Sequence, residues 1–205
     1  MTLRRTFDLI VAAVCLSLAS PILLVTIVAI YITDGRPIFF LQKRSGLFGR
    51  PFTIYKFRSM KINDLPCDDV TEIRSGHPLV TSVGSLIRRY KIDELPQLLN
   101  VLKGEMSLIG PRPTVPEQVE GFSRFEWRRQ EIAPGLTGWA QINGGIDINW
   151  ADRIMLDVWY VDHRSVWLDI QILFQTFAVV LWGDRPNPRR LVQAKAHTLS
   201  QQATD

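Results

Sequence analysis

The fold is decided by an uncharged apolar run near the start of the sequence, residues 9–33, which reads LIVAAVCLSLASPILLVTIVAIYIT. About 20 apolar residues are enough to cross the hydrocarbon core of a bilayer, so this run can enter a membrane. Arg4 and Arg5 precede it. A basic start before an apolar stretch is also the general form of a signal peptide, but this run exceeds a typical signal core and ends without a small-residue cleavage site. We therefore interpret residues 1–35 as a membrane element.

Two features of this element predict that it enters and leaves the membrane on the same side. Pro21 follows Ser20 in the middle of the run, where its ring removes a backbone donor and kinks a helix. Basic residues, which are retained on the cytoplasmic side, lie at both ends of the run. Those that follow it are Arg36, Lys43 and Arg44. We expect a re-entrant helix-break-helix hairpin with its break at Ser20 and Pro21; the alternative is an ordinary span with a proline kink.

Composition limits the rest of the chain to one domain that faces anions. Its 205 residues leave room for one compact core beside the membrane element. A charged fraction of 21% is too high for a polytopic membrane protein, and a net charge of +4 fits anionic lipid, nucleic acid or a phosphorylated substrate. Cys15 lies in the apolar run and Cys67 in a polar stretch, which disfavours a disulfide and favours a reducing compartment. The three histidines lack the spacing of a zinc site.

The residue pattern predicts a mainly α fold with a small irregular β element and interfacial helices. Alternating residues from Phe52 to Arg58 indicate a half-buried strand, and residues 63–78 are polar and rich in turn formers. Regular strand-helix alternation is absent, so we do not expect a doubly wound nucleotide-binding sheet. We expect a catalytic domain over residues 36–183 and a loose polar tail over residues 184–205. The expected helices cover about residues 82–102, with an interruption near Pro96, and residues 116–132, 150–162 and 166–182.

A group of basic residues follows the membrane element and forms a collar at its edge. Attraction to anionic headgroups is worth about 1 kcal/mol for each basic residue near the surface. In a second and compatible interpretation, Lys56 or Arg58 faces a bound phosphate. The residues of this basic collar are Lys43, Arg44, Arg50, Lys56, Arg58 and Lys61.

The side chains suited to chemistry concentrate in residues 88–97, RRYKIDELPQ. Asp93 and Glu94 are adjacent, and neighbouring side chains on a helix diverge by about 100°, so the two carboxylates suit two separate tasks. One can attack phosphorus, as carboxylates do in aspartyl-phosphate chemistry. The other can hold Mg²⁺, which takes one or two carboxylates together with phosphate oxygens. An Asp-Glu pair alone is more often solvated surface than a site.

Arginines near the acidic pair can offset the charge of a diphosphate. Arg88 lies one turn before the pair. Arg112 lies between Pro111 and Pro113, which restrict its backbone and pre-position a bidentate phosphate donor.

Three long stretches together closely resemble the bacterial sugar transferase family. They are residues 88–97, residues 100–113 (NVLKGEMSLIGPRP) and residues 134–144 (PGLTGWAQING). The resemblance extends from the membrane element to about Trp182. Members of this family are monotopic phosphoglycosyl transferases that initiate glycan assembly on undecaprenyl phosphate, and this chain resembles their minimal catalytic form.

The resemblance implies a two-step reaction at the inner membrane, with the catalytic domain facing the cytoplasm. Asp93 would attack the sugar-linked phosphate of a UDP-sugar, giving a covalent phosphosugar-enzyme and UMP. Glu94 would bind Mg²⁺, and Arg88 and Arg112 would engage phosphate. Undecaprenyl phosphate would then take the phosphosugar. Neither the sugar nor an oligomeric state follows from the sequence, although a homo-oligomer is compatible with it, and no nucleic-acid partner is expected.

Some positions leave alternatives open. By the resemblance, Asp157 and Asp169 match recurrent acidic positions, and for both a structural role weighs at least as much as substrate contact. Many relatives have arginine where this chain has Gly145, which bears on donor specificity; Arg153 is a possible substitute. Two other functions are a membrane-anchored glycosyltransferase that releases UDP and a non-catalytic membrane scaffold. The released nucleotide distinguishes them.

Overall fold

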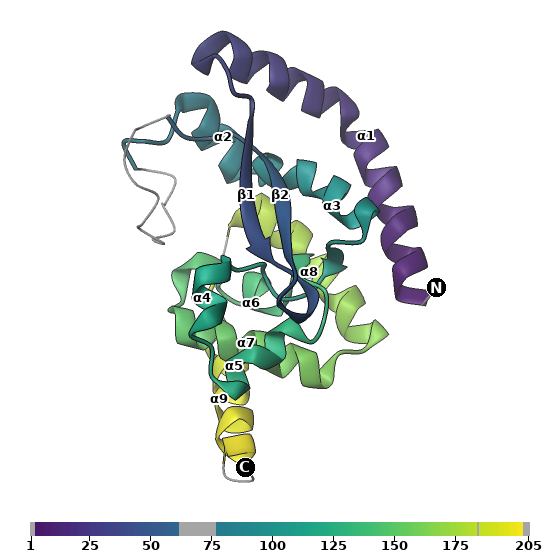
Figure 1. The fold of residues 1–205 in the computed structure, drawn as a ribbon, viewed down its shortest axis with the longest axis vertical. Helices are drawn as coiled ribbons and strands as arrows, with labels where there is room; N and C mark the ends of the chain where they lie inside the picture. Colours follow the sequence, from purple (N-terminus) through teal and green to yellow (C-terminus); the bar gives the residue numbers. More distant parts are fainter. Residues whose placement is uncertain (1–2, 62–76, 184, 203–205) are drawn as a thin grey trace.

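The computed structural model describes residues 3–61, 77–183 and 185–202. Helices make up most of this part of the chain, and two small sheets complete it (Figure 1). The prediction of a mainly α fold with a small β element is confirmed. Most of the expected loop at residues 63–78, including Cys67, lies outside the described residues.

The first sheet is a long hairpin made of β1 (Phe39–Ser45) and β2 (Pro51–Phe57). The strands are antiparallel, and Phe39 pairs with Phe57 at the open end. Phe52 and Ile54 of β2 are buried on one face of the hairpin, because alternate side chains of a strand point to the same face. Phe57, on the opposite face, is buried in a separate cluster. The half-buried strand expected from Phe52 to Arg58 is therefore confirmed, apart from its last residue.

Three short helical segments follow in the place of the helix expected at residues 82–102. They are α2 (Ser82–Arg89), the 3₁₀ segment η2 (Ile92–Gln97) and α3 (Leu98–Lys103). The interruption comes earlier than expected, at Lys91, whose backbone is left-handed with φ of 56°. Pro96 itself lies inside η2.

The second sheet pairs β3 (Ser107–Ile109) with β4 (Gly135–Thr137) in parallel. The chain crosses itself closely here: a Cβ on Gly135 would lie 2.0 Å from the backbone nitrogen of Gly110, so only glycine fits. Between the strands, the helix expected at residues 116–132 is divided, because Gly121 ends one turn and Ser123 caps the next. The segments are α4 (Pro116–Glu120), α5 (Arg124–Trp127) and the 3₁₀ segment η3 (Arg128–Gln130).

The remaining helices surround the core. The short helices α6 (Trp139–Ile142) and η4 (Gly145–Asp147) lead into α7 (Trp150–His163) and α8 (Val166–Trp182), which agree with the expected ranges. The buried side chains of Trp139, Leu156 and Tyr160 lie at the centre of the main core.

The C-terminal segment is not the loose tail expected from its polar composition. Residues 188–202 form α9 (Pro188–Gln202), which lies against α7. Ala194 of α9 is fully buried, and Lys195 forms an ion pair with Asp152 of α7 at 3.0 Å. A few inward-facing positions were enough to dock this helix.

The apolar run forms one helix, α1 (Leu3–Asp34), which is long and apolar enough to cross a membrane. The helix bends about midway, over the top of the molecule in Figure 1. Pro21 lies inside it, and the Ser20 hydroxyl donates to the carbonyl of Ser17 at 2.7 Å. The expected break at Ser20 and Pro21 therefore takes the form of a bend within a continuous helix.

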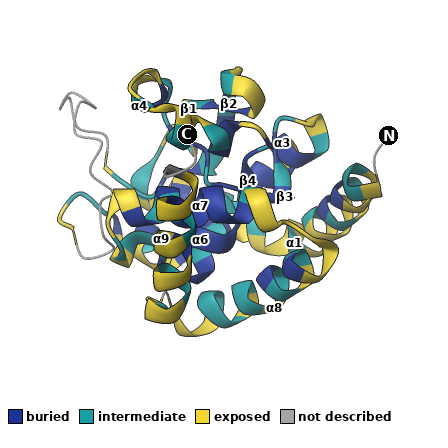
Figure 2. Cartoon of the chain, turned by 90° about the horizontal axis from the view of Figure 1, so that it is seen from below, coloured by how far each residue is buried: buried dark blue, intermediate teal, exposed yellow. Residues whose placement is uncertain are grey.

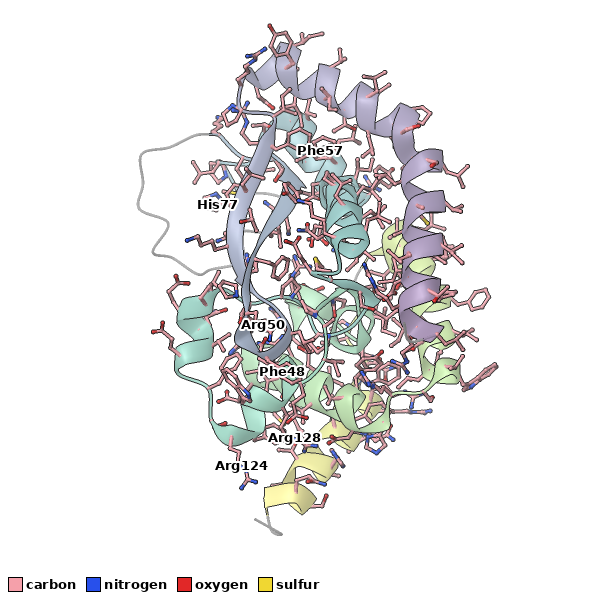
Figure 3. The ribbon with its side chains drawn as sticks, turned by 45° about the vertical axis from the view of Figure 1, so that its right-hand side comes forward. Phe48, Arg50, Phe57, His77, Arg124 and Arg128 are labelled. Carbon is pink, nitrogen blue, oxygen red and sulfur yellow. The ribbon has the colours of Figure 1, made fainter. Side chains whose placement is uncertain are left out.

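Both ends of α1 are attached to the same domain. At its start, Arg5 donates to two backbone carbonyls of α3 at 2.5 and 2.9 Å, and the buried Asp8 accepts from the Ser107 hydroxyl and the Leu108 nitrogen. At its end, the buried Arg58 donates to the carbonyls of residues 34 and 35 at 2.6 and 2.9 Å. Cationic donors at terminal carbonyls also complement the helix dipole. Side chains on the outer side of α1 point away from the rest of the chain (Figure 3).

Between its attached ends, α1 covers a second small core. Ile30 of α1 packs with Phe57 of β2 and Ile87 of α2, and all three are buried. The outer sides of α1 and α8 are largely exposed (Figure 2), although both helices are apolar. On α8 the exposed apolar residues are Val166, Trp167, Ile170, Phe174, Phe177, Leu181 and Trp182. An exposed apolar surface is typical of a site that interacts with a membrane or with another protein.

We predict that Asp8→Ala loosens the start of α1 from the domain. The change removes a charged acceptor from the buried Leu108 nitrogen and the half-buried Ser107 hydroxyl of β3, so the free energy of unfolding should fall by about 3 kcal/mol. Chemical denaturation in detergent measures this. The control is Thr33→Ala, whose exposed hydroxyl bonds only within its own helix. Equal losses for both variants would contradict the proposed attachment.

Candidate active site

The acidic pair lies in η2, between the β1–β2 hairpin and the segment that follows β3. A 3₁₀ helix has three residues per turn, so Asp93 and Glu94 diverge by about 120°. The divergence expected for an α-helix is therefore kept in a tighter helix. Lys91, in its left-handed conformation, sets the start of η2 after α2.

Glu94 is held by two cations from other parts of the chain. Its Oε1 accepts from the Lys56 Nζ at 2.8 Å and from an Arg112 nitrogen at 2.6 Å, and its Oε2 accepts from the second Arg112 nitrogen at 3.3 Å. The contact with Arg112 is thus bidentate. Burial by itself raises the pKa of Glu94, but the charges of Arg112 and Lys56 outweigh it and hold the pKa well below its usual range.

Asp93 has the opposite shift. Only 9% of this residue is exposed. Burial raises its pKa from 3.8 to about 6, the Glu94 charge adds to the rise, and Lys56, Arg88 and Arg112 oppose it. The two neighbouring carboxyl groups thus have pKa values pushed apart by their surroundings, which is how acid, base and nucleophile roles are separated in active sites.

The two remaining basic residues of the site are arranged around this pair. Burial lowers the pKa of Lys56, the nearby Arg112 lowers it further, and Glu94 opposes both. Arg88, in the last turn of α2, is close enough to lower the pKa of Asp93 by its charge. Five residues predicted from sequence are therefore brought together: Lys56, Arg88, Asp93, Glu94 and Arg112.

Arg58 and Asp157 are not part of this cluster. Arg58 contacts the end of α1, so the structure gives it a helix-capping role and no contact with Glu94. Asp157 is buried in α7 and forms an ion pair with Arg129 at 2.6 Å. Burial raises the pKa of Asp157 to about 6, against the opposing charge of Arg129. The structural alternative for Asp157 is thus the one that its contacts favour.

Asp169 and Arg153 also have structural partners. Asp169 accepts from the Tyr160 hydroxyl at 2.6 Å and pairs with Arg4 of α1 at 3.1 Å. Arg153 donates to the carbonyls of Ile148 and Ile146 at 3.1 and 3.4 Å, in the segment that follows Gly145.

Sequence reasoning missed two positioning residues. Arg129 donates to the backbone carbonyl of Arg112 at 2.9 Å, so the Asp157–Arg129 pair holds the segment that carries Arg112. Asn100 is fully buried; its side chain accepts from the Tyr55 nitrogen and donates to the Thr53 carbonyl, which fixes β2 against α3. Asn100 lies in the motif of residues 100–113, but no local pattern in the sequence indicates the contact of Arg129 with Arg112.

The donor groups of the site fit Mg²⁺ only together with a substrate. Among the described residues, no three His, Cys, Asp or Glu side chains gather as a metal-binding group. Mg²⁺ is bound through one or two carboxylates with phosphate oxygens and waters, and Glu94 and Asp93 provide such carboxylates. Since Glu94 already accepts from Lys56 and Arg112, a cation there requires those two side chains to turn toward phosphate.

Comparison with known proteins identifies the family. The family model for bacterial sugar transferases matches residues 1–183. The chain belongs to the bacterial sugar transferase family. The matched residues include the long apolar helix α1, the acidic pair and Arg112.

Individual relatives cover the chain almost completely. It is 48% identical to an uncharacterized sugar transferase, EpsL, of Bacillus subtilis, over 97% of this chain and 96% of that protein. It is 41% identical to a UDP-N-acetylgalactosamine-undecaprenyl-phosphate N-acetylgalactosaminephosphotransferase of Aeromonas hydrophila, over 88% of this chain but 44% of that protein. It is 39% identical to a UDP-glucose:undecaprenyl-phosphate glucose-1-phosphate transferase of Escherichia coli, over 85% and 39%. The chain thus spans less than half of these last two relatives.

We predict that breaking the Asp157–Arg129 pair destabilises the transferase more than replacing it. Asp157→Leu leaves a buried, uncompensated Arg129 and should lower the free energy of unfolding by about 3–5 kcal/mol. In the double variant Asp157→Leu/Arg129→Met no charge remains buried, so the loss should be smaller. Denaturant titration measures both. The single change Arg129→Met completes the comparison. A double variant that loses as much stability as the sum of Asp157→Leu and Arg129→Met would show that the pair has no coupling.

Proposed function

We propose that this chain transfers a sugar-1-phosphate from a UDP-sugar to undecaprenyl phosphate, giving undecaprenyl-diphosphate-sugar and UMP. Two of its relatives are named for this type of transfer. The observation that carries the mechanism is the pair of adjacent carboxyl groups with opposite pKa shifts, set among Lys56, Arg88 and Arg112. This reaction would be the first membrane step of glycan assembly.

In the first step Asp93 acts as the nucleophile. A carboxylate oxygen attacks the phosphorus that carries the sugar, a P–O bond forms to Asp93, and the P–O bond to the UMP oxygen breaks with its electron pair leaving on UMP. The positive charges of Arg88, Arg112 and Lys56 offset the charge that develops on the phosphate oxygens. The product is an aspartyl-phosphosugar.

In the second step a phosphate oxygen of undecaprenyl phosphate attacks the same phosphorus. The bond to Asp93 breaks and returns the free carboxylate, so the cycle closes without an added oxidant or reductant. Bound Mg²⁺, held by Glu94 together with substrate oxygens, would neutralise charge on the diphosphate. Arg112 and Lys56, which now hold Glu94, would contact phosphate when Glu94 holds the cation.

The attachment of α1 supports placement at one face of the bacterial inner membrane, with the catalytic domain in the cytoplasm. A spanning helix leaves one end on each side of the bilayer, whereas Asp8 and Arg58 tie both ends of α1 to one domain. Basic residues at both ends favour the cytoplasmic side. A re-entrant α1 and the exposed apolar face of α8 would hold the site at headgroup depth, where the carrier phosphate lies.

We predict that Asp93→Asn abolishes the covalent intermediate without harming the fold. Purified wild-type protein given labelled UDP-sugar and Mg²⁺, without lipid, should retain labelled phosphosugar and release UMP, and the variant should do neither. The pKa of Asp93 is raised to about 6 in the fold, so above that pH the ionised carboxylate is less stable in the folded chain than in the unfolded chain. Asp93→Asn removes this charge, so the variant should unfold at a higher temperature than wild type at pH 8.

The matched control is Glu120→Gln, which alters an exposed carboxylate on α4. It should retain label and release UMP at the wild-type rate. Near-normal turnover in Asp93→Asn would exclude Asp93 as the nucleophile. Release of UDP in place of UMP would instead support a glycosyltransferase, and release of neither nucleotide across a panel of UDP-sugars would support a non-catalytic scaffold.

We predict a pH dependence for the first step that follows the ionisation of Asp93. The carboxylate is the reactive form, so the single-turnover rate should rise as pH increases through about 6 and then level off. Lys56→Met removes a charge that lowers this pKa, so its profile should move to higher pH. The control Lys43→Met, at an exposed position of β1, should keep the wild-type profile. A shift to lower pH in Lys56→Met would contradict this electrostatic assignment.

A further inference from the structure

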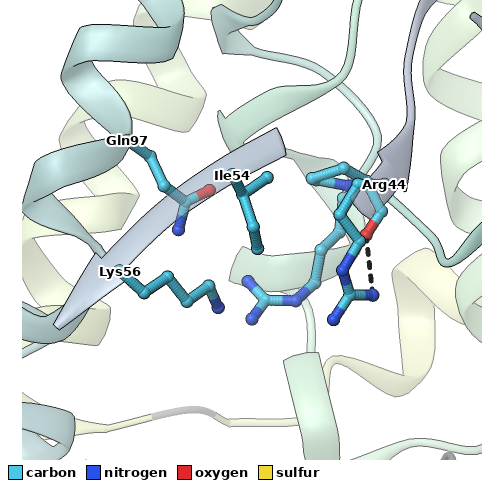
Figure 4. A pocket seen from close by; sticks show the side chains of 6 residues that line it. Arg44, Ile54, Lys56 and Gln97 are labelled. Carbon is cyan, nitrogen blue, oxygen red and sulfur yellow. Dashed lines mark hydrogen bonds between the residues drawn. The ribbon is translucent and has the colours of Figure 1, made fainter. Parts of the chain in front are cut away.

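A small cavity adjoins the two cations that hold Glu94. Figure 4 shows it beside β2, between the side chains of Gln97 and Arg44. It is lined by Arg44, Ile54, Lys56, Gln97, Arg112 and Pro113. Arg44 is fixed at its edge by a hydrogen bond to the Pro113 carbonyl at 3.3 Å. Three of the six lining residues are cationic and none is anionic, and two of the three, Lys56 and Arg112, are paired with Glu94. The cavity therefore suits an anion when these two side chains turn away from Glu94.

Gln97 is the one neutral polar residue of this lining. Only 2% of it is exposed, and its Nε2 has no hydrogen-bond partner among the residues that the structure describes. In Figure 4 the carboxamide points into the space beside Ile54 and Lys56. Burying an amide donor without an acceptor is costly, so an unpaired donor of this kind in a native fold calls for an explanation.

The geometry of η2 places Gln97 next to the catalytic pair. Residues three apart in a 3₁₀ helix eclipse one another, so Gln97 lies on the same side of η2 as Glu94, one turn later. Lys56 and Arg112 contact Glu94 and also line the cavity. An anion that draws these two side chains toward it therefore comes within reach of the Gln97 carboxamide.

We propose that Gln97 is a substrate-binding residue whose Nε2 donates a hydrogen bond to an oxygen of a phosphate bound at the mouth of this cavity. Phosphate offers several acceptor oxygens, which suits a lining of two arginines, one lysine and one amide donor. Within the proposed function, on which this inference rests, the phosphate belongs either to the diphosphate of the donor or to the carrier lipid. Both sources share the chemistry that the cavity recognises.

The test is Gln97→Met, which keeps the length of the side chain and removes the donor. The donor arm measures the dissociation constant of UDP by calorimetry with detergent-solubilised protein, which needs no turnover. The carrier arm measures the KM for undecaprenyl phosphate. Loss of a hydrogen bond to a charged group weakens binding by about 10- to 100-fold. We therefore expect either the dissociation constant of UDP or the KM for undecaprenyl phosphate to rise by this factor, and the constant that rises identifies the source of the phosphate.

Stability separates this role from a structural one. Because the wild-type amide nitrogen has no acceptor, Gln97→Met should unfold at the same temperature as wild type or higher. Gln97→Glu places a negative charge where the phosphate would bind, so it should weaken the same arm as Gln97→Met. A purely structural Gln97 would lower stability and leave both constants unchanged, and this result would overturn the proposal.

The matched control is Gln141→Met. The Gln141 amide also lacks hydrogen-bond partners within the described residues, but it does not line this cavity. Gln141→Met should have the wild-type dissociation constant for UDP and the wild-type KM for undecaprenyl phosphate. If either constant rose as much as in Gln97→Met, the proposal would also be overturned. If wild type binds UDP and releases UMP while Gln97→Met behaves as wild type, the inference fails and the proposed function stands. If wild type does neither, the proposed function fails and the inference fails with it.

Discussion

The structure depends on one electrostatic constraint: an ionised Glu94 held between Lys56 and Arg112. These three residues come from η2, β2 and the segment after β3, so a single carboxylate ties together the hairpin, the central helices and the second sheet. The same ion cluster creates the surroundings of Asp93. Burial, followed by the negative charge of Glu94, raises the pKa of Asp93, and the cations keep that rise moderate. A buried carboxyl group that still ionises near neutral pH is the result.

The supporting contacts act on the backbone that carries these side chains. Asn100 fixes β2, and Arg129 holds the carbonyl of Arg112 while its own charge is paired with Asp157. Glycine allows the chain to cross itself closely at Gly135, which sets β4 beside β3. Chemistry that relies on charged side chains needs such rigid support, because small displacements change both the pKa values and the reach of the cations.

The helix α1, which we interpret as the membrane element, is attached to the domain that carries this ion cluster. Its contacts through Asp8 and Arg58 bring both ends of α1 onto one domain, with its outer side left apolar and exposed. The acidic pair and the exposed face of α8 then lie on a domain that can rest at an interface. In the proposed reaction, this arrangement would bring a water-soluble donor and a lipid carrier to one site.

The sequence by itself determined what depends on local pattern. The apolar run of residues 9–33 predicted the long α1, and the helices expected at residues 150–162 and 166–182 lie within a residue or two of α7 and α8. The motifs of residues 88–97 and 100–113 indicated the family, and five of the predicted site residues do meet. Only the tertiary structure decided which basic residue of the strand reaches the acidic pair. Lys56 lies in β2 and Arg58 follows directly after it. Lys56 contacts Glu94, whereas Arg58 contacts the end of α1. It also decided that Asp157 is paired inside the core and that residues 188–202 form a docked helix. These outcomes rest on contacts between residues far apart in the chain, which local sequence patterns do not encode.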